Sequence, residues 1–328
     1  MEPLLKVENL RIELTTRSGV APVIDDLSFE LGAGESISFV GESGCGKSMT
    51  ALGIMGLLPD KIGRVASGSI TFNGEELTTA NDKRLREIRG NEISMIFQEP
   101  MTSLNPVYTI GEQIAEVLRA HQGLGRRAAW DQAAELLDAV RIPNARGRIG
   151  DYPFQMSGGQ RQRVMIAIAL ACKPKILIAD EPTTALDVTV QAQIFDLLND
   201  LRRQTGTAII MITHDMGAVA EMAERMIVMY AGRNAEQGPV EQIIERPRHP
   251  YTKGLISCVP HLVKVLNDER QNLTEVPGIV PSLSEFGKDQ CLFASRCKQV
   301  TQNCLDRRPP ETPFENGQRS ACWHAEDV

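Results

Sequence analysis

The segment Gly41–Ser48 (Gly-Glu-Ser-Gly-Cys-Gly-Lys-Ser) constrains the fold of this chain more than any other. It follows a short apolar run, Ser36–Val40, typical of a buried strand, and precedes an apolar helical pattern from Met49 to Leu58. Glycines let the backbone turn tightly, so that successive N–H groups converge on phosphate oxygens, and the helix start adds the positive end of its dipole. The pattern G-x-x-x-x-G-K-S therefore predicts a phosphate-binding loop, with nucleotide contacts from Gly41, Glu42, Ser43, Gly44, Cys45, Gly46, Lys47 and Ser48.

A second apolar run, 175–179, is followed directly by Asp180 and Glu181 and supplies the acidic half of such a site. We expect Lys47 to reach the β- and γ-phosphates of ATP, and Ser48 and Asp180 to bind Mg²⁺. Glu181 is the candidate general base, because a carboxylate at this place can orient and polarise the attacking water. Together the two segments predict a Mg²⁺-dependent nucleotide-phosphate site, as kinases and switch GTPases with a phosphate-binding loop also have.

Strand-like apolar runs alternate with helical patterns over the first 250 residues, which is typical of a mostly parallel α/β sheet. The expected strands are 5–14, 23–31, 36–40, 92–97, 175–179 and 207–213, and the expected helices are 49–58, several within 111–146, 158–172 and 190–203. From Arg246 the chain becomes rich in proline and loses clear periodicity, so we place a domain boundary near residue 250. The length of 328 residues agrees with two domains at about 150 residues each.

Net charge and hydropathy limit the kinds of partner and the cellular location that we expect for this chain. The net charge of −7 argues against nucleic acid as a partner, since surfaces that bind phosphate backbones are usually basic. The longest apolar run, Val164–Cys172, has nine residues, whereas a membrane span needs about 20. The segment Met1–Lys6 shows no secretory signal, so we expect the chain to stay in the cytosol.

Four of the seven cysteines fall in the last 38 residues, where a uniform distribution would place about one. In a reducing cytosol such a group indicates a metal site rather than disulfides. Four thiolates suit zinc or an iron–sulfur cluster, and the spacing C-x₅-C-x₆-C-x₁₇-C lacks the C-x₂-C pair that is usual in zinc ribbons. The candidate ligands are Cys291, Cys297, Cys304 and Cys322.

The segment Met156–Arg163 (Met-Ser-Gly-Gly-Gln-Arg-Gln-Arg) separates this chain from other phosphate-loop proteins, because it resembles the signature of ABC transporter nucleotide-binding subunits. The resemblance implies an ABC-type P-loop NTPase domain at 1–250. Such a domain has a mostly parallel sheet, an antiparallel β subdomain and a helical subdomain, here at about 100–165. In the family, this signature in one subunit caps the γ-phosphate bound by the other, which assigns nucleotide contacts to Ser157, Gly158, Gly159 and Gln160.

Other positions match the same family in order along the chain. Gln98 matches the glutamine that contacts Mg²⁺ and the attacking water and senses the membrane partner. Asp187 matches the loop that crosses the dimer interface, and His214 matches the switch histidine that touches the γ-phosphate. The family's adenine-stacking aromatic is missing, and Arg17 could stack its guanidinium on the base instead.

Two longer stretches, Met95–Ile114 and Glu245–Leu255, look like dipeptide/oligopeptide transporter ATPases, some of which import nickel, glutathione or sugars instead. The resemblance implies a peripheral subunit at the cytoplasmic face of the inner membrane. Its implied partners are a second, related ATPase, two membrane permeases and an extracytoplasmic substrate-binding protein. It also implies that the C-terminal domain, 251–328, carries a [4Fe–4S] cluster on the four cysteines, which we favour over zinc or free thiols. The alternative function is a soluble ABC-type ATPase of a non-transport machine.

Overall fold

The computed structural model describes residues 2–17, 19–98, 103–183, 186–258 and 276–326. The chain divides into two compact units that are each assembled from several chain segments. The first unit comprises residues 1–4, 31–36 and 79–212. The second unit comprises residues 5–30, 37–78 and 213–328.

The sheet of the first unit contains three parallel strands in the order β6-β7-β8. These are β6 (Ile93–Ile96), β7 (Ile176–Asp180) and β8 (Ala208–Thr213), the last residue of which belongs to the second unit. Every residue of the three strands is buried, as expected for apolar runs in a parallel sheet. The three strands expected near these positions are confirmed.

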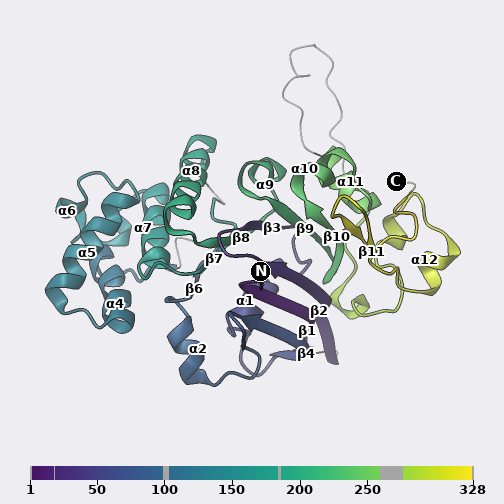
Figure 1. Cartoon of the computed structure of the whole chain (residues 1–328), viewed down its shortest axis with the longest axis horizontal. Coiled ribbons are helices and arrows are strands. Elements are labelled where there is room, and N and C mark those ends of the chain that lie inside the picture. Colours follow the sequence, from purple (N-terminus) through teal and green to yellow (C-terminus); the bar gives the residue numbers. More distant parts are fainter. Residues whose placement is uncertain (1, 18, 99–102, 184–185, 259–275, 327–328) are drawn as a thin grey trace, which may run out of the picture. The chain divides into compact units, whose positions relative to one another are not determined.

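Helices make up most of the rest of the first unit. They are α2 (Asp82–Ile88), α4 (Ile110–Gln122), α5 (Arg126–Ala139), α6 (Ala145–Arg148), the 3₁₀ turn η1 (Pro153–Gln155), α7 (Gly158–Leu170) and α8 (Val188–Thr205). Helices α4, α5 and α7 pack on one another (Figure 1) through buried alanine and leucine side chains. Thr109 caps α4 by accepting a hydrogen bond from the N–H of Glu112. Helices therefore fill the region from residue 110 to 170, where sequence periodicity predicts them.

The second unit contains two sheets. One has the order β2-β1-β4-β5 and consists of β1 (Leu5–Thr16), β2 (Gly19–Leu31), β4 (Gly63–Phe72) and β5 (Glu75–Glu76). The other follows the order β11-β12-β10-β9-β3 and consists of β3 (Ser36–Val40), β9 (Arg225–Tyr230), β10 (Arg233–Pro239), β11 (Thr312–Pro313) and β12 (Arg319–Ser320). Strands β3 and β9 are parallel, whereas β9, β10, β12 and β11 are successively antiparallel. Both sheets are therefore built from distant parts of the sequence.

The helices of the second unit are short. They are α1 (Lys47–Ile54), α9 (Met216–Met222), α10 (Val240–Glu245), α11 (Pro250–Ser257), η3 (Leu283–Glu285), η4 (Ala294–Arg296) and α12 (Gln302–Asp306). One hydrophobic core includes Val228 and Tyr230 of β9, Tyr251 of α11, and Leu292 and Phe293 near the C-terminus. Residues from both sides of position 250 thus share a core, and the domain boundary placed there stays a prediction.

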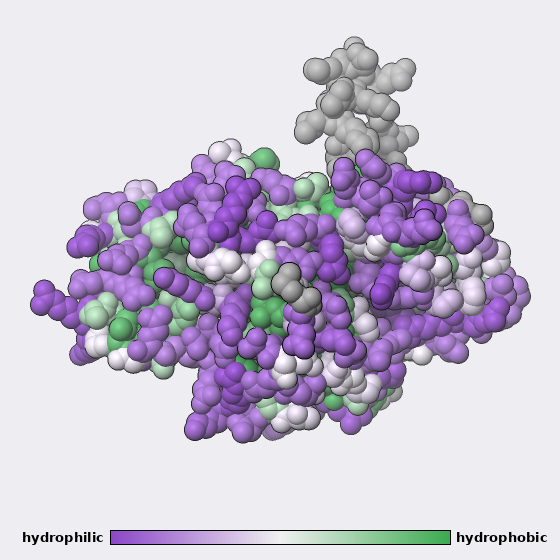
Figure 2. All heavy atoms as spheres, in the orientation of Figure 1, coloured by the Kyte–Doolittle hydropathy of each residue, from purple (hydrophilic) through white to green (hydrophobic). Residues whose placement is uncertain are grey.

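The face drawn in Figure 2 is covered mainly by hydrophilic side chains, with apolar groups in small separate spots. Within the part of the chain that the structure describes, no helix has the length and hydropathy needed to cross a membrane.

Candidate nucleotide site

The phosphate-binding loop connects β3 to α1 in the second unit. Gly41, Gly44 and Gly46 have φ angles of 154°, 81° and 105°, a region that side chains rarely adopt. A Cβ atom on Gly41 would clash with the carbonyl oxygen of Met229, and one on Gly46 would lie 2.5 Å from Cδ1 of Ile24. The glycines are therefore required by the backbone path and by its close contacts, as the motif predicts.

Lys47 is buried at the first position of α1. Its Nζ donates hydrogen bonds to the carbonyl oxygens of Gly41 at 2.7 Å and Glu42 at 3.0 Å. Burial raises the pKa of the neighbouring Cys45 thiol, which favours the protonated and unreactive form. Ser48 lies in the same helical turn and is partly exposed. The loop thus places a lysine ammonium and a serine hydroxyl at the start of one helix.

In the first unit, Asp180 is the buried last residue of β7, and Glu181 follows it. Glu181 has a φ of 47°, an uncommon conformation for a side chain other than glycine. Its Oε2 accepts a hydrogen bond of 2.8 Å from Nε2 of Gln98, which lies just beyond β6. The carboxyl ends of two neighbouring parallel strands therefore bring together the predicted base and the predicted glutamine.

The signature segment, Ser157–Gln160, forms the start of α7. The hydroxyl of Ser157 accepts from the N–H of Gln160 at 3.3 Å, and Oε1 of Gln160 accepts from the N–H of Ser157 at 3.1 Å. This reciprocal pair is a capping box, which satisfies two N–H groups at the helix end. The next two N–H groups belong to Gly158 and Gly159, which carry no side chain of their own.

A cavity of about 450 Å³ lies beside the signature segment in the first unit. Asp187 caps α8 by accepting from the N–H of Val190 at 2.9 Å, and both residues line the cavity. Arg163 also lines it, and donates to the carbonyl oxygen of Val140 and to Oε1 of Gln193. The structure thus brings together the signature and Asp187, two motifs that are about 30 residues apart in the sequence.

His214 directly follows β8 and is exposed. The next residue, Asp215, caps α9 by accepting from the N–H groups of Gly217 and Ala218. Arg17, the candidate adenine contact, is exposed in the turn after β1. The roles of both residues toward a nucleotide stay predictions.

Two residues that no motif indicated contact the phosphate-binding loop. The hydroxyl of Tyr251 in α11 accepts a 2.9 Å hydrogen bond from the N–H of Glu42. The guanidinium of Arg296 in η4 donates to both carboxylate oxygens of Glu42, at 2.7 and 2.9 Å. Separations of 209 and 254 residues explain why local patterns do not reveal these contacts.

None of the four C-terminal cysteines forms a disulfide. Among the residues that the structure describes, no three His, Cys, Asp or Glu side chains are arranged to hold a metal ion. The thiols nevertheless interact electrostatically. Burial, together with the charges of neighbouring cysteines of the group, raises the pKa of Cys291 to about 11 and of Cys322 to about 12. The expected cluster ligands thus share one neighbourhood without metal-site geometry.

Hydrogen bonds to sulfur are a second feature of this cysteine group. The Sγ of Cys297 accepts from the N–H of Gln299 at 3.3 Å, and the Sγ of Cys322 accepts from the N–H of His324 at 3.4 Å. The Sγ of Cys304 lies 3.5 Å from the hydroxyl of Thr301. Such bonds stabilise thiolate over thiol.

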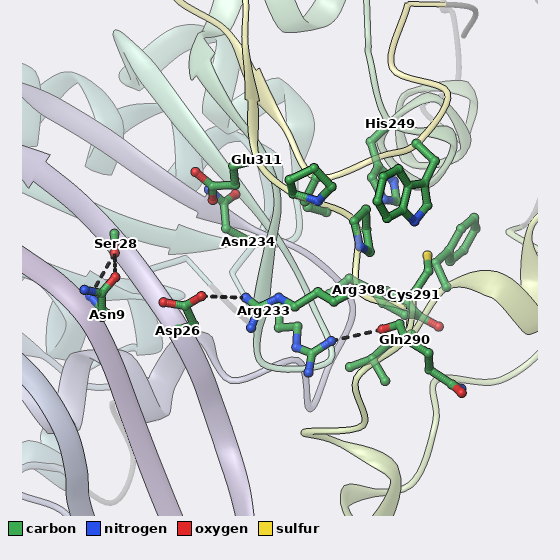
Figure 3. Close-up of a pocket in the computed structure, with 18 residues that line it drawn as sticks. Asn9, Asp26, Ser28, Arg233, Asn234, His249, Gln290, Cys291, Arg308 and Glu311 are labelled. Atoms are coloured by element: carbon green, nitrogen blue, oxygen red, sulfur yellow. Dashed lines mark hydrogen bonds and ion pairs between the residues drawn. The ribbon is translucent and has the colours of Figure 1, made fainter. Parts of the chain in front are cut away.

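A cavity of about 500 Å³ lies between the C-terminal segment and strands β2 and β10 of the second unit (Figure 3). At its wall, Arg233 forms two hydrogen bonds with Asp25, at 2.7 and 2.9 Å, and donates to the carbonyl oxygens of Lys288 and Gln290. Arg308 pairs with Asp26 at 3.1 Å. The Arg308–Asp26 pair and the bonds of Arg233 to the two carbonyl groups attach the C-terminal segment to the strands.

Comparisons with known proteins identify the class. The family model described as ABC transporter matches residues 24–184. A solved ATP-binding cassette, in a dimeric post-hydrolysis state with ADP and Pi, aligns with 72% of this chain and 98% of its own, at 28% identity and a TM-score of 0.64. The cbiO1 structure from Clostridium perfringens, part of a transporter complex, covers 75% of this chain and 92% of its own, at 26% identity and a TM-score of 0.63. The fold is that of an ABC ATPase, as the sequence predicts.

The C-terminal region and the full-length relatives show to which branch of the ABC ATPases this chain belongs. The family model described as oligopeptide/dipeptide transporter, C-terminal region, matches residues 235–304. The oligopeptide transport ATP-binding protein OppD of Haemophilus influenzae is 50% identical over 98% of both chains. A putative peptide import ATP-binding protein of Brucella abortus is 46% identical over 100% of this chain and 98% of its own. This chain therefore belongs to the oligopeptide/dipeptide branch of the ABC transporter ATP-binding proteins.

Proposed function

We propose that this chain hydrolyses ATP to drive import of oligopeptides or dipeptides through an ABC transporter. The observation that carries the proposal is the 2.8 Å hydrogen bond between Gln98 and Glu181, because it joins the predicted base to the predicted sensor of the membrane partner. The identity of 50% to a named oligopeptide transport protein supports peptides as the cargo. Nickel, glutathione and sugars are the alternative solutes within the family.

Each motif receives a role in hydrolysis. Lys47 binds the β- and γ-phosphates, and Ser48 and Asp180 hold Mg²⁺. Glu181 orients and polarises the attacking water, which Gln98 also contacts together with Mg²⁺. His214 touches the γ-phosphate. The other loop residues, from Gly41 to Gly46, surround the phosphates with backbone N–H groups.

The signature segment serves a second ATPase subunit. The N–H groups of Gly158 and Gly159 are presented at a helix N-terminus, next to the cavity lined by Asp187. We propose that they contact the γ-phosphate held by the partner's phosphate-binding loop. Closure of the pair is then strongest with ATP bound, so that hydrolysis reopens it. The partner is a related chain in a heterodimer.

Two membrane permeases and an extracytoplasmic substrate-binding protein complete the complex. The first unit exposes several large apolar side chains near Gln98 in the sequence: Phe97 is 43% exposed, Val107 is 72% exposed and Tyr108 is 52% exposed. Exposed apolar groups favour contact with a protein partner. We propose that the permeases dock here, which places the chain peripherally at the cytoplasmic face of the inner membrane.

Glu181→Gln tests the assignment in the assembled transporter, reconstituted in vesicles. The variant should bind ATP normally and lose turnover by about 100-fold or more, because the amide cannot polarise the attacking water. Glu135→Gln, a change at an exposed site of α5, is the matched control and should keep turnover. Undiminished hydrolysis in Glu181→Gln would refute the role. Hydrolysis without any stimulation by permeases and peptide would favour the non-transport alternative.

We also propose that 251–328 forms a C-terminal domain in which Cys291, Cys297, Cys304 and Cys322 bind a [4Fe–4S] cluster. Three properties support this: the thiols are close enough to raise one another's pKa, backbone N–H groups donate to their sulfurs, and they form no disulfides. The cluster would supply crosslinks that order a segment with little regular structure.

Elemental analysis of anaerobically purified protein tests this second proposal. Four irons and four sulfides per chain would support it, in a ratio set by the cluster formula. Stoichiometric zinc without iron would refute it in favour of the zinc alternative. The variant Cys172→Ser is the control, because Cys172 lies in the first unit and should not affect the metal content.

A further inference from the structure

Arg296 is the most completely bonded cation of the C-terminal segment. Its side chain is only 2% exposed, and its two terminal nitrogens donate to the two carboxylate oxygens of Glu42 at 2.7 and 2.9 Å. A bidentate pair between a guanidinium and a carboxylate fixes both distance and orientation. Glu42 is the second residue of the phosphate-binding loop, so this pair joins the segment between two cysteines to the loop.

The remaining donors of Arg296 hold the guanidinium in place. Nε donates to the carbonyl oxygen of Pro277 at 2.7 Å, and Nη2 also donates to that of Val276 at 3.1 Å. Nη1 also donates to the hydroxyl of Tyr230 at 3.3 Å, and the guanidinium lies 5.6 Å from the centre of that ring. The side chain is thus oriented before it meets Glu42, and the pair loses little conformational freedom.

The backbone of Glu42 is held as firmly as its side chain. Its N–H donates to the hydroxyl of Tyr251 at 2.9 Å, and its carbonyl oxygen accepts from Nζ of Lys47 at 3.0 Å. Arg296 and Tyr251 therefore fix the position of Glu42, whose carbonyl oxygen accepts the hydrogen bond from Lys47. One hydrogen bond thus connects the backbone of Glu42 directly to the ammonium group of Lys47.

We propose that Arg296 is a positioning residue for ATP binding, through which the cysteine-bearing segment sets the nucleotide affinity of the phosphate-binding loop. The inference rests on the proposed ATPase function. Arg296 acts in two ways: it fixes the loop in one conformation, and it neutralises a carboxylate that would otherwise repel the triphosphate. Neither effect involves the bond-breaking step, so Arg296 acts on binding and not on turnover.

The local fold around Arg296 connects it to the cysteines. The N–H groups of Ala294 and Cys297 donate to the carbonyl oxygens of Cys291 and Ala294, and the N–H of Cys291 donates to the carbonyl oxygen of Cys304. Arg296 therefore lies on a tight turn whose ends are Cys291 and Cys297. We therefore expect a change in the state of these thiols to shift the turn and with it the guanidinium.

The test measures ATP binding to the single chain and ATP hydrolysis by the assembled transporter. A fluorescent Mg·ATP analogue gives the dissociation constant of the full-length chain, and the reconstituted transporter gives KM and kcat. Arg296→Ala should raise the dissociation constant and the KM for ATP about tenfold or more, the loss expected for a charge-assisted bidentate pair. Its kcat at saturating ATP should stay within about threefold of the wild type.

A double variant distinguishes repulsion of ATP by the unpaired Glu42 carboxylate from a general loss of structure. Arg296→Ala combined with Glu42→Gln also removes the repelling carboxylate but does not restore the lost positioning, so we expect an affinity between those of Arg296→Ala and the wild type. Arg308→Ala is the matched control, because Arg308 also attaches the C-terminal segment by an ion pair, to Asp26, without touching the loop. It should leave ATP affinity unchanged.

Equal affinities of Arg296→Ala and Arg308→Ala, or a double variant weaker than Arg296→Ala, would overturn the proposal. Where Arg296→Ala does not fold, Arg296→Lys keeps the charge and loses the bidentate geometry, and should give an intermediate rise in KM. Thermal unfolding of each variant reports the folded fraction. Absence of peptide-stimulated hydrolysis would refute the proposed function alone, because binding is measured on the single chain.

Discussion

The phosphate-binding loop and the signature segment both start a helix with glycines, yet the chain supports them in different ways. The phosphate-binding loop is buried at Gly41, Cys45 and Lys47 and is held by Tyr251 and Arg296, more than 200 residues away. The signature segment is exposed at Ser157 and Gly158 and partly buried at Gly159 and Gln160, and Ser157 and Gln160 bond to each other in its own capping box. The first is completed within one chain, whereas the second presents its donors outward. This difference agrees with a loop that binds ATP alone and a signature that needs a partner.

The largest effect should come from the tight backbone path of the phosphate-binding loop. Gly41→Ala puts a methyl group against the carbonyl oxygen of Met229 and 2.8 Å from the Sγ of Cys45. We expect ATP affinity of the single chain to fall by about 100-fold or more, because the loop must leave its phosphate-binding conformation. Equilibrium binding of the nucleotide analogue measures it.

Gly74→Ala is the control for that change. Gly74 also has a positive φ, 80°, but nothing lies within 4 Å of its Cβ position. It should lower stability by about 1 kcal/mol and keep ATP affinity. Similar affinities of the two variants would show that the close contacts of Gly41 do not shape the loop.

The next effect should appear only in the assembled transporter. Ser157→Ala removes the capping hydroxyl of the signature, which should lower turnover about 100-fold while ATP binding to the single chain stays unchanged. Thr109→Ala removes an equivalent cap from α4 and should reduce stability by about 1 kcal/mol without slowing turnover. Weakened ATP binding by the single Ser157→Ala chain would break the distinction between the two segments.

The stability of the folded chain should depend on pH through Glu236, which bonds to the start of the helix that carries Tyr251. Glu236 in β10 is fully buried and accepts hydrogen bonds from the N–H groups of Arg248 and His249, near the start of α11. Burial raises its pKa to about 7. The folded chain then binds more protons than the unfolded chain between about pH 4.5 and 7, so its stability falls as pH rises through this range.

Glu236→Gln should remove that pH dependence. Between pH 5 and pH 8 the wild type should lose about 2.5 kcal/mol of unfolding free energy relative to the variant. Denaturant unfolding at both pH values measures the difference. The exposed Glu241→Gln in α10 is the control and should track the wild type. A wild type that gains stability relative to Glu236→Gln over this range would contradict the raised pKa.

The smallest effect should connect the cysteines to the phosphate-binding loop. Cys297→Ser weakens the turn that carries Arg296, and should raise the KM for ATP about threefold with kcat unchanged. Cys258→Ser, in which the lost thiol only donates to the carbonyl oxygen of Gly254, should not change KM. A change in kcat with a constant KM would place the cysteines outside nucleotide binding.

Much of this molecule could be predicted from short stretches of sequence. Strands β3, β6, β7 and β8 are apolar runs, and each lies within two residues of its expected bounds. Helix α1 begins at Lys47 and ends at Ile54, earlier than the expected 49–58, because the glycine loop itself leads into the helix and Gly56 ends it with a positive φ. Periodicity reports which residues are apolar and does not report where a turn starts.

The C-terminal segment was the least predictable part. Its elements η3, η4, α12, β11 and β12 have two to five residues each, too few for a period to emerge. They are held in place by the ion pair of Arg308 with Asp26, by hydrogen bonds from Arg233 to the carbonyl oxygens of Lys288 and Gln290, and by a shared core with β9. The spacing of the cysteines indicated a set of metal ligands. It did not indicate that the turn between Cys291 and Cys297 carries Arg296, which pairs with Glu42.

Conformations that depend only on neighbouring residues could be read from the amino-acid sequence. Glycines at 41, 44 and 46 permit the positive φ angles of the loop, and Ser157 with Gln160 forms a cap because both lie within one helical turn. Only the folded chain brings the distant side chains of Tyr251 and Arg296 to the phosphate-binding loop. The pairing of Arg296 with Glu42 spans 254 residues, and its stability comes from burial and from carbonyl groups of Val276 and Pro277 that only the folded chain assembles.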